Sequence, residues 1–197
     1  MPSRIDDLRD LITQLERELE GELQAARDRW RYRLDAGRVW FERDVRQAHH
    51  RLKQRIPSFI RESSPLTILT APVIYSLIVP IAFLDLWVSA YQRICFPVYG
   101  IARVSRSKYI VLDRQHLAYL NLIEKGNCVF CGYANGVFGY VREIAGRTEQ
   151  YWCPIRHAKR PRGVHAHYHE FVDFGDADGY TQRLPLLRAE LKPKPPE

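Results

Sequence analysis

The sequence predicts an α+β protein with a long amphipathic, coiled-coil-like helix at its start, one transmembrane or re-entrant apolar segment, and a small C-terminal α+β domain. Apolar residues recur at helical spacing near the N-terminus, and a continuous apolar run follows them. Four cysteines follow that run, three of them at metal-ligand spacing. We therefore expect four parts: 1–62 as the helical arm, 66–91 as the membrane segment, 93–191 as a metal-binding domain, and 192–197 as a disordered tail.

The N-terminal arm carries the apolar pattern of a coiled-coil seam. Its residues step along the chain by three and four positions, as in a heptad repeat. They are Ile5, Leu8, Ile12, Leu15 and Leu19. The pattern predicts a helix over 5–34 that forms a homo-oligomer. A second amphipathic helix is expected over 39–56, with aromatic residues on one side and basic residues on the other, as in a helix at a membrane surface.

The apolar segment at 66–91 is long enough to cross a membrane. As a helix, its 26 residues would extend about 39 Å, against a hydrocarbon core of roughly 30 Å. A turn at Pro80 would instead make the segment re-entrant. We interpret Asp85, the segment's one acidic residue, as hydrated near an interface, although an ionisable group inside a membrane can also mark a functional site.

The distribution of charge indicates which partners the chain binds, but it does not indicate how the chain is oriented in a membrane. The 20 residues before the apolar segment carry five Lys or Arg, and the 20 after it carry four, so the positive-inside rule gives no clear orientation. We expect a bacterial-type inner membrane with the C-terminal domain in the cytoplasm. After the segment, the chain contains 16 basic and 10 acidic residues. This positive excess favours anionic lipid as a partner. The basic residues are scattered, so no nucleic acid is expected.

Within the C-terminal domain, the pattern predicts a short strand at 109–112 and helices at 117–124 and 137–151. The cysteines add the sharpest motif, because Cys128 and Cys131 are separated by two residues and followed by glycine. Cys153 and His157 come later, separated by three residues. Together they match a tetrahedral zinc site, C-x2-C-x21-C-x3-H.

In local form, this pattern resembles the half-sites of zinc ribbons and rubredoxin-like knuckles over residues 128–157. The resemblance implies a zinc-knuckle-like turn at the first cysteine pair, with Zn²⁺ as the expected metal. The second half offers a single cysteine, so Cys95 is a rival to His157 as the fourth ligand. Four cysteines would also suit iron or an iron–sulfur cluster. A redox dithiol and ordinary unliganded cysteines are the alternatives to a metal.

Three histidines form a second, weaker candidate cluster. His165, His167 and His169 alternate along the chain, so a strand would place all three on one face, where they could bind zinc, copper or iron. The alternative is a polar surface without a ligand. Glu143 and Glu149 could form a polar network beside such a site.

These observations predict a membrane-anchored, metal-binding interaction or assembly protein, with structural zinc. The alternative is a membrane-associated redox or metal-dependent enzyme that uses iron–thiolate or histidine chemistry. No spacing in the sequence matches a catalytic metal motif, so a non-enzymatic role is favoured.

Overall fold

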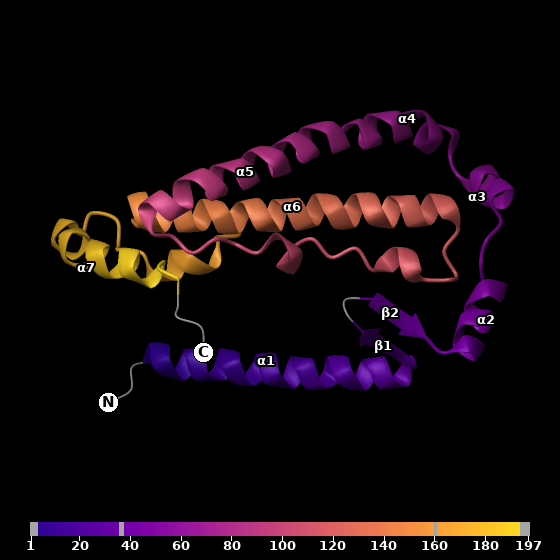
Figure 1. Ribbon diagram of the computed structural model, residues 1–197, viewed down its shortest axis with the longest axis horizontal. Helices are drawn as coiled ribbons and strands as arrows, with labels where there is room; N and C mark the ends of the chain where they lie inside the picture. The colour runs from indigo at the N-terminus through magenta and orange to yellow at the C-terminus, as the bar shows by residue number, and fades with distance from the viewer. Residues whose placement is uncertain (1–3, 36–37, 160, 194–197) are drawn as a thin grey trace. The chain divides into compact units, whose positions relative to one another are not determined.

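The computed structural model describes residues 4–35, 38–159 and 161–193, and these are mostly helical (Figure 1). The chain divides into two compact units. The first contains residues 1–62 and 113–125, and the second contains residues 63–112 and 126–197. Of the expected C-terminal tail, residues 194–197 lie outside the described part.

The predicted α+β class is wrong. Among the described residues, paired strands are confined to one short hairpin in the first unit and to a single bridge between Ile155 and Val172. The expected strand at 109–112 is an unpaired connection. The expected helix at 137–151 is confirmed as the second half of a longer helix, α6 (Leu122–Trp152). This helix also takes the place of the knuckle and begins inside the expected helix at 117–124. Its buried Val137, Tyr140 and Ile144 recur every three or four positions, and this helical period outweighs the turn signals within it.

The first unit begins with α1 (Arg4–Arg29), which is shorter than the predicted helix. Arg31 takes a positive φ of 52°, which ends the helix, and strands β1 (Tyr32–Asp35) and β2 (Arg38–Phe41) follow as an antiparallel hairpin. Helices α2 (Arg43–Arg51) and α3 (Ile56–Glu62) complete the region. The expected helix at 39–56 thus starts as a strand. The side chains of Ile5 and Leu8, in the predicted seam, lie outside the described part.

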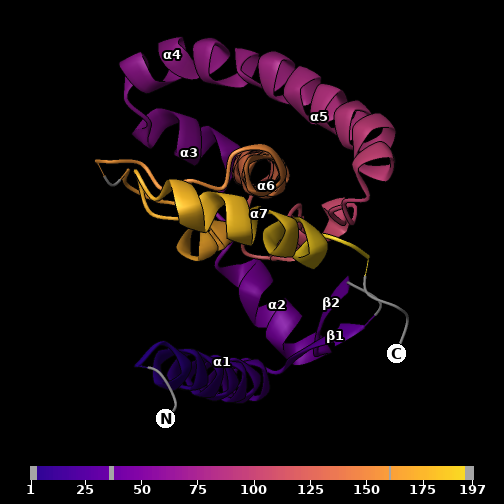
Figure 2. The ribbon, with the colours of Figure 1, turned by 90° about the vertical axis from the view of Figure 1, so that its left-hand side faces the viewer.

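The second unit is built on two long helical runs and a short C-terminal helix. Helices α4 (Pro65–Ser76) and α5 (Ile78–Tyr99) follow one another in a gentle curve beside α6, as Figures 1 and 2 show. Because Pro80 has no N–H to donate to the preceding turn, the helix is interrupted near Leu77. The chain does not turn back at Pro80, so the structure lacks the re-entrant form. Helix α7 (Ala177–Glu190) closes the unit.

The core of the second unit lies between α5, α6 and the connection that joins them. It contains six buried apolar residues: Phe96, Ile101, Val104, Tyr140, Ile144 and Leu191. A smaller cluster holds Ile81 of α5 against Ala134 and Val137 of α6. Gly136 allows the connection to cross α6 closely, since a Cβ there would lie 2.8 Å from the Ile110 Cα. One face of α5 is therefore fixed by protein contacts.

One helical stretch of the described chain, Pro65–Tyr99, is long and apolar enough to cross a membrane. Its most apolar window has a mean hydropathy of 2.1, and 6% of that window is buried by the protein itself. The finding rests on length and composition.

Candidate functional site

The residues with the most concentrated polar chemistry lie where the segment after α6 returns along that helix. This segment includes a 3-10 turn, Ala166–Glu170, instead of the predicted strand. Two of its histidines face carboxylates on the last turns of α6. We call His165, His167, Glu143, Glu149 and Arg147 the histidine–carboxylate site.

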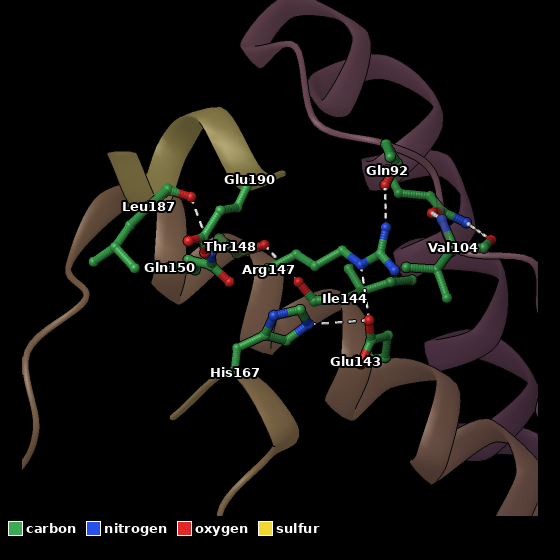
Figure 3. Close-up of polar contacts among 11 residues, drawn as sticks. Gln92, Val104, Glu143, Ile144, Arg147, Thr148, Gln150, His167, Leu187 and Glu190 are labelled. Atoms are coloured by element: carbon green, nitrogen blue, oxygen red, sulfur yellow. Dashed lines mark hydrogen bonds and ion pairs between the residues drawn. The ribbon is translucent and has the colours of Figure 1, made fainter. Parts of the chain in front are cut away.

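Glu143 forms the centre of this site (Figure 3). Its Oε1 lies 3.1 Å from His167 Nε2 and accepts a hydrogen bond of 2.8 Å from Arg147 Nε. Arg147 also donates to the carbonyl of Ala102 at 2.6 Å, which ties α6 to the connection after α5. The hydrogen bond from His167 and, after it, the one from Arg147 together lower the pKa of Glu143 to about 2, against the opposing effect of burial. Glu143 is therefore a carboxylate across the physiological range.

His165 makes the second imidazole–carboxylate contact. Its Nε2 lies 2.8 Å from Glu149 Oε2, while its Nδ1 is buried without a hydrogen-bond partner. The ring packs directly on Gly146, where a Cβ would lie 2.8 Å from both Cγ and Nδ1 of the ring. Arg142 adds hydrogen bonds to the carbonyls of Gly163 and Val164.

Helical spacing explains why α6 can hold this segment. Arg142, Gly146 and Glu149 are separated by four and three positions, so they share one face of the helix. Glu143 and Arg147, four positions apart, form an adjoining row. The arrangement clamps the 163–167 stretch against α6. A carboxylate that accepts a hydrogen bond from one ring nitrogen also fixes the tautomer of the imidazole.

The other two histidines that were predicted as metal ligands, His157 and His169, lie outside the histidine–carboxylate site. His169 is exposed, so the three histidines do not share one face. His157 stacks on the ring of Tyr168, with 5.9 Å between the ring centroids. Among the described residues, no group of three or more His, Cys, Asp or Glu is arranged to hold a metal ion.

The four cysteines are free and are not brought together. Cys128 and Cys131 lie one turn apart on α6, whereas Cys153 directly follows the same helix. The 22 residues from Cys131 to Cys153 correspond to about 33 Å at the rise of an α-helix, far beyond a shared coordination sphere. Cys95 lies on α5. Bound zinc or iron stays a prediction that this arrangement does not support.

The contacts of Gln150, near the end of α6, were not predicted from the sequence. Gln150 donates from Nε2 to the Leu187 carbonyl at 2.9 Å and to Glu190 at 3.2 Å, which fixes α7 on α6 (Figure 3). The i, i+4 spacing of Glu143 and Arg147 was a usable signal for their ion pair. No local sequence pattern indicated that His165 and His167 would pack against the carboxylates of α6.

Asp85 also differs from its predicted state. It is 6% exposed and accepts hydrogen bonds of 3.0 Å from Arg106 Nε and 2.6 Å from Arg106 Nη2. The hydroxyl of Tyr133 on α6 donates to it at 2.9 Å. The carboxylate is thus paired by protein groups instead of being hydrated.

Comparison with known proteins returned no match, either to a family model, to a curated protein or to a solved structure.

Proposed function

We propose that the chain is a membrane-anchored assembly or interaction protein, attached through α4 and α5. The observation that carries this proposal is the outer surface of the two helices. Leu69, Val73 and Val79 are 73%, 68% and 69% exposed, and similar side chains continue along α5. Covering one such side chain contributes about 1.5–3 kcal/mol, so a surface of this length needs a partner of lipid chemistry.

The polar groups of α4 support a hydrocarbon environment. Thr70 Oγ1 donates to the Leu66 carbonyl at 2.9 Å, and Ser76 Oγ donates to the Val73 carbonyl at 2.7 Å. Hydroxyl groups in a bilayer need partners within the protein, because no water is available there. These two groups have such partners on their own helix.

The inward face of α5 supports the same conclusion. Its polar residues Asp85, Ser89 and Gln92 all turn toward protein partners. Gln92 accepts from the Val104 N–H at 2.9 Å and contacts the Tyr140 hydroxyl. The outward face keeps Phe83, Leu86 and Trp87. A helix with its polar groups paired inside and its apolar groups outside suits the boundary between a protein and lipid.

The assembly part of the proposal rests on α1. Four leucines spaced by four residues remain exposed on this helix: Leu11, Leu15, Leu19 and Leu23. An unpartnered apolar stripe on a charged helix suits packing against the same helix of a second copy. The proposed partners are therefore a membrane and another copy of the chain.

The alternative function is a redox or metal-dependent enzyme, and the observation in its favour is the pair of histidine–carboxylate contacts. Elemental analysis and an absorption spectrum of the detergent-purified chain test it. Stoichiometric iron with visible absorption would favour the enzyme. Stoichiometric zinc without colour would favour a structural metal within the assembly role.

Alkaline carbonate extraction of membranes tests the anchor. We expect the unchanged chain to stay in the pellet, and a Val73→Lys/Val79→Lys variant to move to the supernatant, because each lysine costs roughly 2.5–3.5 kcal/mol inside a bilayer. The control is a Leu52→Lys/Ile60→Lys variant, which changes two exposed apolar residues outside the apolar run, at the end of α2 and in α3. This variant should stay in the pellet. Release of the unchanged chain would contradict the proposal.

A further inference from the structure

The first unit contains a cleft of about 400 Å³ that the membrane anchor does not use. It opens between β2, α2 and the residues that lead into α6. Six side chains give it its chemistry: Trp40, Phe41, Arg46, His50, His116 and Lys125. We propose that this cleft binds a phosphate group, carried either by a lipid headgroup or by a free phosphate anion.

The charge of the cleft favours an anion. Arg46 and Lys125 are cations at neutral pH, and His50 and His116 add two ring nitrogens that can donate. No carboxylate is among the lining residues. A phosphate can thus enter without meeting a like charge.

The neighbouring carboxylates are engaged elsewhere. Asp44 accepts a hydrogen bond of 2.6 Å from Arg31, and Glu42 accepts another from the same guanidinium. Glu124, the residue before Lys125, accepts from the Asn121 N–H at 2.8 Å. These carboxylates therefore leave Arg46 and Lys125 available to a ligand.

Aromatic contacts hold the walls of the cleft in place. His49 lies between the rings of Phe41 and Tyr119, at 5.2 Å from each centroid. This contact joins α2 to the hairpin and to the segment before α6. Arg46 and His50 are four residues apart on α2, so they lie on one face of that helix.

The lining defines the chemical class of the ligand. A guanidinium matches phosphate oxygens through paired N–H donors, and a lysine adds a point charge. The indole of Trp40 gives an apolar wall for the carbon part of a ligand. The volume lies within the range of small-molecule sites. A small phosphomonoester fits these features.

Titration of the full chain in dodecyl maltoside tests the proposal. Trp30, Trp87 and Trp152 are exposed, so their replacement by phenylalanine leaves Trp40 as the fluorescence reporter. The ligands are inorganic phosphate, dihexanoyl phosphatidic acid and, as the uncharged comparison, dihexanoyl phosphatidylcholine. We expect saturable fluorescence changes with at least one of the first two and none with the third.

Variants then locate the binding. Arg46→Gln/Lys125→Gln should weaken binding at least tenfold, whereas Arg51→Gln, on another face of α2, should leave it unchanged. If circular dichroism shows that the double variant loses helix, His50→Gln and His116→Gln replace it, each with a severalfold loss expected.

The two sources of phosphate give different supporting results. Binding of inorganic phosphate that competes with phosphatidic acid would assign a free anion to the cleft. Binding of phosphatidic acid alone would assign a lipid headgroup. No saturable change with either ligand, equal binding of phosphatidylcholine, or unchanged binding in folded variants would overturn the proposal.

Discussion

The two long helical runs of the second unit are of similar length but have opposite surroundings. Helix α6 is held by protein: Gly136, Tyr140 and Ile144 are packed, and its charged residues pair with His165, His167 and Ala102. The run α4–α5 is packed along one face of α5, while outer side chains such as Leu69, Val79 and Leu86 are 73%, 69% and 69% exposed. The chain therefore provides the packing contacts of α6 itself, whereas its surroundings must cover the outer face of α4–α5.

The same difference is present within α5, on neighbouring turns. Phe96 is fully buried in the core, whereas Val98, two residues later, is 78% exposed. Two positions along a helix correspond to a rotation of about 200°, so these side chains point in opposite directions. Inward and outward substitutions therefore measure the two environments separately.

The largest expected effect comes from the inward position. Phe96→Ala should lower the free energy of unfolding by about 3–5 kcal/mol, because it removes a fully buried ring and leaves a cavity. Val98→Ala should change it by less than about 1 kcal/mol. Denaturant unfolding in detergent, followed by circular dichroism, measures both. Equal losses would remove the distinction between the faces of α5.

The next effect is the pH dependence of the histidine–carboxylate site. The pKa of Glu143 is about 2 in the folded chain, below its usual 4.5, so the stabilisation is complete above about pH 4.5 and is lost as pH falls through 2. The shift corresponds to about 3 kcal/mol. Thermal unfolding across this window should show the loss, and His167→Gln should reduce it. An unchanged pH profile in that variant would contradict the role of His167.

A smaller effect compares two glycines on α6. Gly146→Ala should lower the free energy of unfolding by about 1–2 kcal/mol, because the new methyl group meets the His165 ring. Gly126→Ala, where no atom lies within 4 Å, should raise it by up to about 1 kcal/mol through helix propensity. Thermal melts of the two variants should therefore shift in opposite directions. A shift in the same direction would mean that the 163–167 stretch does not pack on α6.

The smallest effect concerns the cysteines. Cys131 is exposed and Cys128 is half-buried, so Cys128→Ser/Cys131→Ser should change the free energy of unfolding by less than about 1 kcal/mol. Melting curves recorded beside elemental analysis check this expectation. Loss of one zinc equivalent together with unfolding would instead support the metal site predicted from the sequence.

The sequence predicted those features that depend on local pattern. The apolar run and the N-terminal helix were both visible as periodic or continuous apolar residues, although α1 ends at Arg29 because Arg31 takes a positive φ. The α+β class failed because glycine and Asn-Gly signals in 126–139 were given more weight than the apolar period beside them. In α6 two of these glycines allow close packing instead: Gly136 against Ile110 and Gly139 against Tyr109.

The candidate site shows the same limit. The histidines and Glu143 were noticed as residue types, but their pairing depends on where the chain returns after α6, and local spacing does not contain that information. Cys131 and Cys153 failed to meet for the converse reason, since a continuous helix keeps them apart. Spacing predicts proximity in a turn, whereas inside a helix it predicts separation.

The central claim is that lipid covers the outer face of α4–α5. Photolabelling of the full chain in native membranes with a lipid-dissolved carbene probe, followed by peptide mapping, tests it most directly. The account predicts strong labelling of 65–99, concentrated on outward residues such as Val73 and Leu86, and little labelling of 140–150 in α6. Absence of label from 65–99, or equal label on both helices, would contradict it.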